Sequence, residues 1–291
     1  MVASAKKVAD SAGPGRFSKH RPRAQARARV SFHLFRTVFY LIPLIAIYTI
    51  VLGTLSIASS VFSRAGRFAH HCARAWAWLI LATTGVSVEI KGLERVPRAK
   101  PFLFISNHQS IYDIPVLFWY LPYQLRIIAK DSLGRFPVLG WHLARTGHVL
   151  VQRQNPGSTV FKKVSALMRA NHSLIVFPEG TRSRDGVVGR FKGGIFLLAI
   201  EAGLPIVPVA IDGTRRVMRK GGLTTCPGDV TVEVFDPIDT AGLQAEDARS
   251  LAERVRHTIA GVIVPDRRTP DAAVGDVQAR NLSESSKQAT S

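Results

Sequence analysis

The longest stretch without charge constrains the fold of this chain more than any other feature. From Thr37 to Ser63 there is no Asp, Glu, Lys or Arg, and the segment reads TVFYLIPLIAIYTIVLGTLSIASSVFS. Because about 20 apolar residues are enough for a helix to cross a bilayer, this segment predicts a membrane helix. Its length and its distance from residue 1 are atypical of a cleaved signal peptide. The alternative is a helix buried in a soluble core.

A second apolar segment, AWAWLILATTGVSV from Ala75 to Val88, is too short to cross a bilayer comfortably. Its Trp76 and Trp78 suit the headgroup region. Six Lys or Arg residues at 19–36 precede the first segment and three arginines lie between the two segments, so the positive-inside rule keeps residue 1 in the cytosol. These three arginines are Arg64, Arg67 and Arg74. We therefore predict a helical hairpin, re-entrant or within one leaflet, with its arginines reaching the headgroups.

The charge of the chain favours anionic surfaces. The formal net charge is +19 and 46% of the residues are hydrophobic, which allows a nucleic-acid or anionic-lipid binding module as one interpretation. However, nine Lys or Arg against one Asp lie in residues 1–36, beside the apolar segment, where anionic lipid is the nearer partner. Because no nucleic-acid recognition motif is visible, we expect membrane lipids and no nucleic acid as partners.

Cysteine usage favours a reducing compartment. Cys72 and Cys226 are far apart and form no disulfide framework. His70 and His71 adjoin Cys72, but adjacent histidines rarely converge on one ion, so we expect no metal. Together with the hairpin, this predicts a protein at the inner membrane whose main domain faces the cytoplasm.

Beyond Lys91, runs rich in Val, Ile and Phe alternate with helical patterns. The runs PFLFISN, LRIIAK, GHVLVQR, SLIVFPEG, PIVPVAID and VTVEVFDPI predict strands, and SIYDIPVLFWYL, GSTVFKKVSALMRAN, GGIFLLAIEAG and EDARSLAERVRHTIAGVI predict helices. This alternation predicts an α/β domain with a mixed, largely parallel sheet flanked by helices. We expect four parts: a flexible basic arm (1–36), the membrane hairpin (37–90), the α/β domain (91–264) and a disordered tail (265–291).

The stretch SNHQSIYDIP carries a histidine and an aspartate, His108 and Asp113, five positions apart. On one continuous helix these side chains would point about 140° apart, so they meet only if His108 lies on the turn before the helix. The carboxylate would then fix the imidazole tautomer and stabilise the imidazolium formed when the other nitrogen takes a proton. The alternative is that Ser110 or Asp113 caps a helix and His108 is incidental.

A polar turn follows a strand-like run in VFPEGTRSRDG. It contains Glu179, Gly180, Thr181 and Arg182. Glycine permits close approach of backbone to a ligand, and an arginine beside free backbone amides can hold a phosphate. The alternative is a solvated basic turn.

The order His–x4–Asp in NHQSIYD, Gly147 followed by Arg153, Phe-Pro-Glu-Gly-Thr-Arg in FPEGTRS and a later Val-Pro-Val resembles the four-block signature of the glycerolipid acyltransferases. AKDSLGRFPVLGW also matches closely. The resemblance covers about residues 91–238 and is closest to bacterial 1-acyl-sn-glycerol-3-phosphate acyltransferases. NHQSIYD and FPEGTRS are highly specific in combination, whereas the block around Gly147 is looser. The resemblance implies transfer of an acyl chain from acyl-CoA or acyl carrier protein to the sn-2 hydroxyl of lysophosphatidic acid (1-acyl-glycerol-3-phosphate), giving phosphatidic acid.

A thioester is already activated, so this chemistry needs a base for the hydroxyl rather than a covalent intermediate. The resemblance implies that His108 is that base and that Asp113 orients it. It also implies a phosphate site, for which Arg182 is the first candidate and Lys130 and Arg153 are helpers. Glu179, beside Gly180 and Thr181, would bind a glycerol hydroxyl or brace Arg182.

Two other enzymatic interpretations use the same residues. A hydrolase would require a serine in a strained elbow, and no Gly-x-Ser-x-Gly occurs. An acyltransferase of the same fold could act on another lysophospholipid or a lyso-aminolipid, which the sequence leaves open. In either transferase the acyl thioester is a substrate, so we expect no cofactor.

Overall fold

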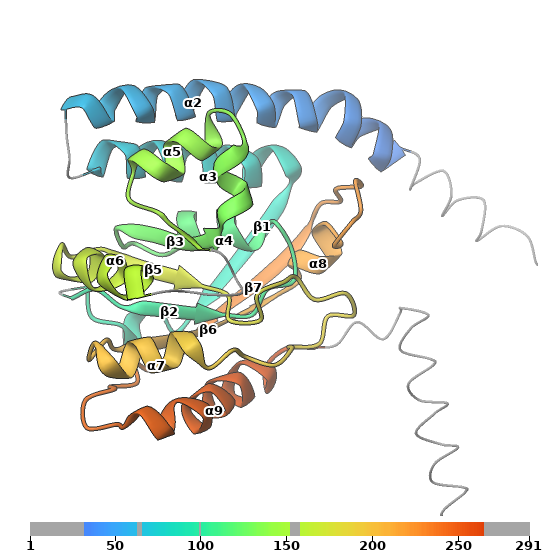
Figure 1. Ribbon diagram of the computed structural model, residues 1–291. Helices are drawn as coiled ribbons and strands as arrows, with labels where there is room; N and C mark the ends of the chain where they lie inside the picture. Colours follow the sequence, from blue (N-terminus) through green and yellow to red (C-terminus); the bar gives the residue numbers. More distant parts are fainter. Residues whose placement is uncertain (1–31, 63–65, 99, 152–157, 265–291) are drawn as a thin grey trace, which may run out of the picture.

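A seven-stranded sheet forms the centre of the protein, with helices on both faces (Figure 1). The computed structural model describes residues 32–62, 66–98, 100–151 and 158–264. The strand order is β1-β7-β6-β2-β5-β3-β4. Neighbouring strands are parallel except β6 and β7, which are antiparallel. The predicted mixed, largely parallel sheet is therefore confirmed.

The strands are β1 (Val86–Lys91), β2 (Leu103–Ser106), β3 (Leu125–Lys130), β4 (Val149–Val151), β5 (Ser173–Val176), β6 (Ile206–Asp212) and β7 (Gly228–Val234). The α-helices are α2 (Ile42–Phe62), α3 (Arg67–Thr84), α4 (Asp113–Tyr120), α5 (Leu139–Arg145), α6 (Ser158–Arg169), α7 (Gly194–Glu201), α8 (Thr214–Val217) and α9 (Ala248–Ala260). A π-helical turn, η1 (Thr37–Leu41), leads into α2, and short 3-10 turns are η2 (Leu93–Arg95), η3 (Asp131–Arg135) and η4 (Ala245–Asp247).

Two hydrophobic cores sandwich the sheet because successive side chains of a strand point to opposite faces. In β2, Leu103 and Ile105 pack with side chains of α6, α7 and α9. Phe104 points the other way, into a core shared with α3 and α4. Every residue of β2 is buried, as expected of a parallel strand covered on both faces.

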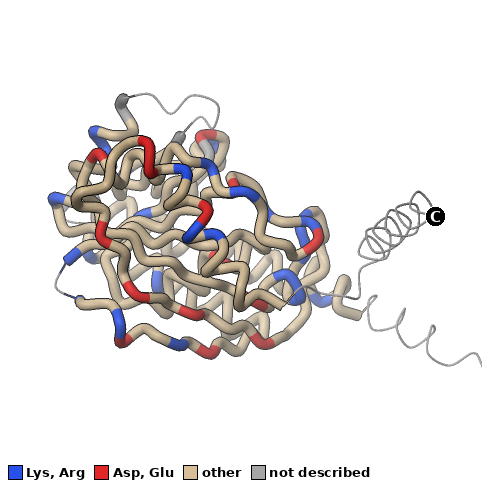
Figure 2. The backbone as a smooth tube through the Cα atoms, turned by 90° about the horizontal axis from the view of Figure 1, so that it is seen from below, with Lys and Arg blue, Asp and Glu red and all other residues tan. Residues whose placement is uncertain are grey.

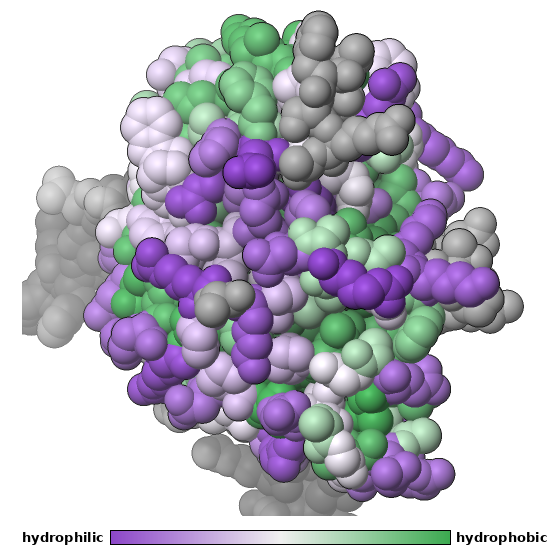
Figure 3. All heavy atoms as spheres, turned by 90° about the vertical axis from the view of Figure 1, so that its left-hand side faces the viewer, coloured by the Kyte–Doolittle hydropathy of each residue, from purple (hydrophilic) through white to green (hydrophobic). Residues whose placement is uncertain are grey.

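Helices α2 and α3 form the predicted hairpin and lie across one side of the domain (Figure 1). The helix from Phe32 to Ser59 is long and apolar enough to cross a membrane, and only 6% of its most apolar window is buried. The end of the molecule seen in Figure 3 is hydrophobic at the top, where α2 and α3 lie. Figure 2 shows the contrasting side below the sheet, where positive and negative residues are interspersed.

Hydrogen bonds from residues 36 to 56 hold α2 and the turns before it against the domain. The Arg36 guanidinium donates to the Thr84 carbonyl at 3.3 Å. The Trp76 indole donates to Thr49 Oγ1 at 3.0 Å, and Ser56 Oγ lies 2.7 Å from His142 Nδ1. Because these contacts are spread along its length, α2 lies along the domain rather than standing away from it.

The second half of the predicted hairpin is partly wrong. Helix α3 begins at Arg67 instead of Ala75 and ends at Thr84, and Val86 already starts β1. Trp76 does not face headgroups, because it bonds to α2. Arg74 does not extend away from the protein either, because it donates to the Leu121 carbonyl at 2.9 Å. The domain division at residues 90 and 91 stays a prediction.

The topology brings distant chain segments to one edge of the sheet. Strands β2, β3, β5 and β6 run parallel to one another, so their carboxyl ends lie at the same edge of the sheet. Ligands of open α/β sheets bind in the crevice beyond these ends. His108, Glu179 and Thr214 follow β2, β5 and β6, respectively, which locates the candidate site.

Candidate active site

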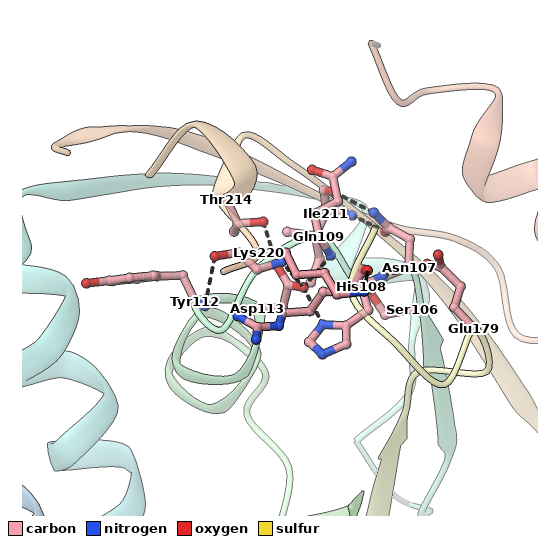
Figure 4. A network of polar contacts seen from close by, with 12 residues as sticks. Ser106, Asn107, His108, Gln109, Tyr112, Asp113, Glu179, Ile211, Thr214 and Lys220 are labelled. Atoms are coloured by element: carbon pink, nitrogen blue, oxygen red, sulfur yellow. Dashed lines mark hydrogen bonds and ion pairs between the residues drawn. The ribbon is translucent and has the colours of Figure 1, made fainter. Parts of the chain in front are cut away.

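His108 and Asp113 form a hydrogen-bonded pair at the carboxyl edge of the sheet. His108 Nδ1 lies 2.7 Å from Asp113 Oδ2. His108 occupies the loop after β2, and Asp113 is the first residue of α4. The pair thus meets in the geometry that the sequence required, with the histidine ahead of the helix and turned back over it (Figure 4).

The Asp113 carboxylate is fully buried and fully occupied. Its Oδ2 also accepts the backbone N–H groups of Gln109 at 2.8 Å and Ser110 at 3.0 Å. Its Oδ1 accepts the hydroxyl of Thr214 at 2.5 Å. Both Asp113 and Thr214 are 0% exposed. These donors hold the carboxylate in one orientation, with Oδ2 directed at the His108 ring.

Sequence reasoning missed Thr214. It lies 101 positions from Asp113, and a threonine after a strand carries no signal by itself. Only the parallel pairing of β2 with β6 brings it to the carboxylate. The preceding turn contains Gly213 at φ 100°, a conformation that favours glycine and redirects the chain into α8.

The His108 backbone and ring are held from three sides. Its N–H donates to Glu179 Oε1 at 2.8 Å, and its carbonyl accepts the Ser183 N–H at 2.7 Å. Its ring stacks on Phe177 with centroids 4.2 Å apart. The preceding Asn107 pairs through both side-chain amide atoms with the Ile211 backbone. The loop is therefore fixed to both neighbouring strands.

Glu179 supports the histidine loop. Its second oxygen, Oε2, accepts the Gly189 N–H at 3.1 Å, so both oxygens bond to backbone groups. Burial is the main cause that raises the pKa of Glu179 above its ordinary value. Of the two predicted roles, bracing is closer to this geometry, but the braced residue is His108 rather than Arg182.

Arg182 stands with His108 at the same cavity. Its carbonyl accepts a hydrogen bond from Lys220 Nζ at 2.8 Å, and Lys220 also donates to Thr181 Oγ1 at 2.7 Å. Gly180 has φ +71°, and a Cβ there would lie 3.2 Å from Lys192 Nζ. The predicted turn therefore gathers cationic groups beside the histidine.

The structure describes only one of the two residues that were predicted to assist Arg182 in phosphate binding. Lys130 ends β3, at the same edge of the sheet as His108. Arg153 lies outside the described residues. Within the described ranges, no group of three or more His, Cys, Asp or Glu side chains could hold a metal ion.

An apolar cavity of about 340 Å³ begins at His108 and Arg182. Its walls come from α2, α3, α4, β3 and α5, so it lies between the hairpin and the sheet. Apolar side chains such as Leu52, Ile114 and Leu133 line most of it. The arrangement thus combines a hydrogen-bonded histidine–aspartate pair, a cationic turn and a hydrophobic chamber.

Comparisons with known proteins agree with this arrangement. The family model described as Acyltransferase matches residues 87–212. A chloroplastic 1-acyl-sn-glycerol-3-phosphate acyltransferase of Brassica napus, BAT2, is 36% identical over 191 residues, which are 63% of this chain and 55% of the relative. The human 1-acyl-sn-glycerol-3-phosphate acyltransferase alpha is 33% identical over 178 residues, 60% of this chain and 63% of the relative. This chain therefore spans little more than half the length of the plant relative.

A solved structure is similar over most of its length. The crystal structure of the 1-acyl-sn-glycerophosphate (LPA) acyltransferase PlsC from Thermotoga maritima superposes with a TM-score of 0.68 at 26% identity. The match covers 81% of this chain and 95% of that chain. The similarity thus extends beyond the residues matched by the family model.

Proposed function

We propose that this chain, which matches the Acyltransferase family model over residues 87–212, transfers an acyl chain from a thioester to the sn-2 hydroxyl of 1-acyl-glycerol-3-phosphate. The observation that carries the proposal is the His108–Asp113 bond of 2.7 Å at the mouth of an apolar cavity. The names of its relatives support the same acceptor.

The histidine supplies the base. Since Nδ1 is bonded to Asp113, Nε2 takes the proton of the acceptor hydroxyl as its oxygen attacks the thioester carbonyl. The resulting tetrahedral intermediate collapses by breaking its C–S bond, and the departing thiolate receives the proton back from Nε2. Asp113 stabilises the imidazolium between these steps, and a positioned base of this kind contributes about 10²–10⁴-fold.

The cationic turn binds the acceptor phosphate in this proposal. Arg182 adjoins His108 at the cavity mouth, and an arginine forms two parallel bonds to a phosphate. Charge-assisted bonds contribute about 1.5–3 kcal/mol each. Lys130 and Arg153 would assist in binding the phosphate. Gly180 and Thr181 would let the turn come close to the glycerol.

The cavity receives the acyl chain of the donor. Burying hydrocarbon between α2, α3 and α4 removes apolar surface from water, at about 0.8 kcal/mol per CH₂. The donor is acyl-CoA or acyl carrier protein, and the reaction requires no cofactor because the thioester is itself reactive.

The exposed face of α2 supports a membrane location. Ile47, Ile50 and Leu55 are 55%, 56% and 48% exposed, although water disfavours large apolar patches. We place this face in the cytoplasmic leaflet of the inner membrane, with the sheet in the cytoplasm. A lysolipid would then reach His108 without leaving the bilayer.

Acyl transfer by purified protein tests the proposal. Lysophosphatidic acid, other lysophospholipids and a lyso-aminolipid would be offered with both donor types. His108→Gln should abolish product, whereas His71→Ala, which replaces an exposed histidine of α3, should retain it. Turnover of the lyso-aminolipid, which lacks the phosphate, equal to that of lysophosphatidic acid would favour a different acceptor class. Activity in folded His108→Gln protein would overturn the mechanism.

A further inference from the structure

The acyl cavity has a second polar end, far from the reacting groups. His142 and His148 line it together with Phe118 and Ile127. The Ile127 backbone N–H donates to His148 Nδ1 at 3.1 Å. Ile127 precedes Lys130, the last residue of β3, by three positions, which is about 10 Å along a strand. The polar end therefore lies about that far from the carboxyl edge that holds His108.

The protonation of His148 follows from its contacts. Because Nδ1 accepts a backbone N–H, the ring carries its proton on Nε2. Burial lowers the pKa of His148 and lowers that of His142 to about 4, so both rings are neutral near pH 7. The two rings lie 5.5 Å apart, and His142 Nδ1 is engaged by Ser56.

The His148 Nε2–H has no acceptor among the residues that the structure describes. It belongs to a side chain lining a chamber that is otherwise mostly apolar. A polar group left unpaired in apolar surroundings is unfavourable. A bound molecule that brings an oxygen to this end would remove that penalty, whereas a plain hydrocarbon chain would not.

Arg126 adds positive potential behind the histidines. Its side chain is buried at 3% exposure, and its Nη1 donates to the Leu125 carbonyl at 2.8 Å. Its Nε has no partner. No described carboxylate lies within ion-pair distance of this guanidinium. Its positive charge acts on both His142 and His148, so the far end of the cavity favours an electron-rich oxygen.

We propose that this polar end binds a hydroxyl or oxo group in the middle or distal part of the donor acyl chain, with His148 Nε2 as the hydrogen-bond donor. The inference rests on the proposed acyl transfer and adds the class of acyl chain. A hydroxyl beside the thioester carbonyl would not reach, because that part of the chain lies at His108. Ordered water in the same place is the competing occupant.

Three CoA thioesters of one chain length test the proposal with the full-length protein. One is palmitoyl-CoA, the second has a hydroxyl in the middle of the chain, and the third has it beside the thioester carbonyl. We expect kcat/KM for the mid-chain hydroxyl to exceed that of palmitoyl-CoA by about fivefold, the factor of one net hydrogen bond. The third thioester should show no gain. Equal or lower kcat/KM for the mid-chain hydroxyl would overturn the proposal and leave water as the occupant.

Variants locate the effect. His148→Phe should remove the fivefold preference, but it also removes the acceptor of the Ile127 N–H. His142→Leu spares that contact and should weaken the preference through the neighbouring ring. Leu133→Ala, on the apolar wall, is the matched control and should change kcat/KM by the same factor for palmitoyl-CoA and for the mid-chain hydroxyl thioester. A preference that persists in folded His148→Phe protein would refute the role of this residue.

A binding measurement separates this inference from the proposed reaction. Trp76 lines the cavity, so its fluorescence reports occupation in inactive His108→Ala protein. Tighter binding of the mid-chain hydroxyl chain supports the polar end even if no acceptor is acylated. Binding of palmitoyl-CoA as tight as that of the hydroxyl chain contradicts it even if acyl transfer is confirmed.

Discussion

Asp113→Asn separates the charge of the carboxylate from its hydrogen-bonding geometry. An asparagine oxygen in the place of Oδ2 can keep the three N–H donors of His108, Gln109 and Ser110. Its NH₂ group would then face Thr214 Oγ1, which now donates but can accept instead, because a hydroxyl does both. We therefore expect a folded protein with the histidine tautomer retained.

The expected loss in kcat comes from the missing negative charge. Opposite unit charges about 4 Å apart attract by about 4 kcal/mol at an effective dielectric constant of about 20. Only the imidazolium formed during the reaction gains this energy, so the barrier rises by about that amount. At about 1.4 kcal/mol per factor of ten, kcat should fall by about 10³-fold.

Steady-state transfer at saturating acceptor and donor measures the loss in kcat, and the melting temperature shows whether the variant stays folded. Asp113→Asn combined with Thr214→Val is the control, since the amide then lacks an acceptor and stability should fall by about 1–3 kcal/mol. A folded Asp113→Asn enzyme with kcat within about tenfold of wild type would show that Asp113 does not stabilise an imidazolium.

Four further outcomes are expected. His108→Ala should abolish transfer in a protein that still folds, and measurable turnover above the uncatalysed rate would exclude His108 as the base. Arg182→Ala should raise KM for lysophosphatidic acid more than KM for a phosphate-free acceptor, and parallel changes would contradict phosphate binding. Burial raises the pKa of Glu179, so the folded state keeps the carboxyl proton to a higher pH than the unfolded state does. The stability of the wild type should therefore fall relative to that of Glu179→Gln as the pH rises from about 4 to 7. A difference in melting temperature that stays constant over this range would refute this. Single cysteines at Ser4 and Ser285, with the native cysteines replaced, should resist impermeant reagents in intact cells, and labelling at Ser285 would reverse the orientation.

The meeting of His108 and Asp113 could be predicted because their spacing and the preceding apolar run set the local geometry. The FPEGTRS turn could be placed beside them only through the family resemblance, since nothing local links residues 70 positions apart. The contacts of Glu179 could not be predicted from the sequence, because its partners are the backbone N–H groups of His108 and Gly189. Backbone groups leave no pattern in the sequence of side chains.

Most strands were predictable because buried β-branched runs are distinctive, whereas the two shortest α-helices, α5 and α8, were not. Helix α5 is only seven residues long and follows Pro137, so the periodicity over it is too brief to read. Strand β1 has alternating half-buried and exposed residues and directly follows α3. Its apolar residues therefore extended the helical pattern and moved the predicted end of the hairpin beyond Thr84.

The uncharged segment that dominates the sequence has two tasks in the proposed function. Thr49, Leu52 and Gly53 of α2 line the acyl cavity, and by helical spacing they share one face with Ser56. Ile47 and Ile50 lie on the opposite, exposed face. One face must be apolar to hold hydrocarbon from the thioester, and the other must be apolar to lie among lipid tails. A helix with one such task could carry charges on its free side, as α6 does with Lys162 and Lys163. The absence of charge all round α2 therefore fits the proposal that it forms the wall between the acyl cavity and the membrane.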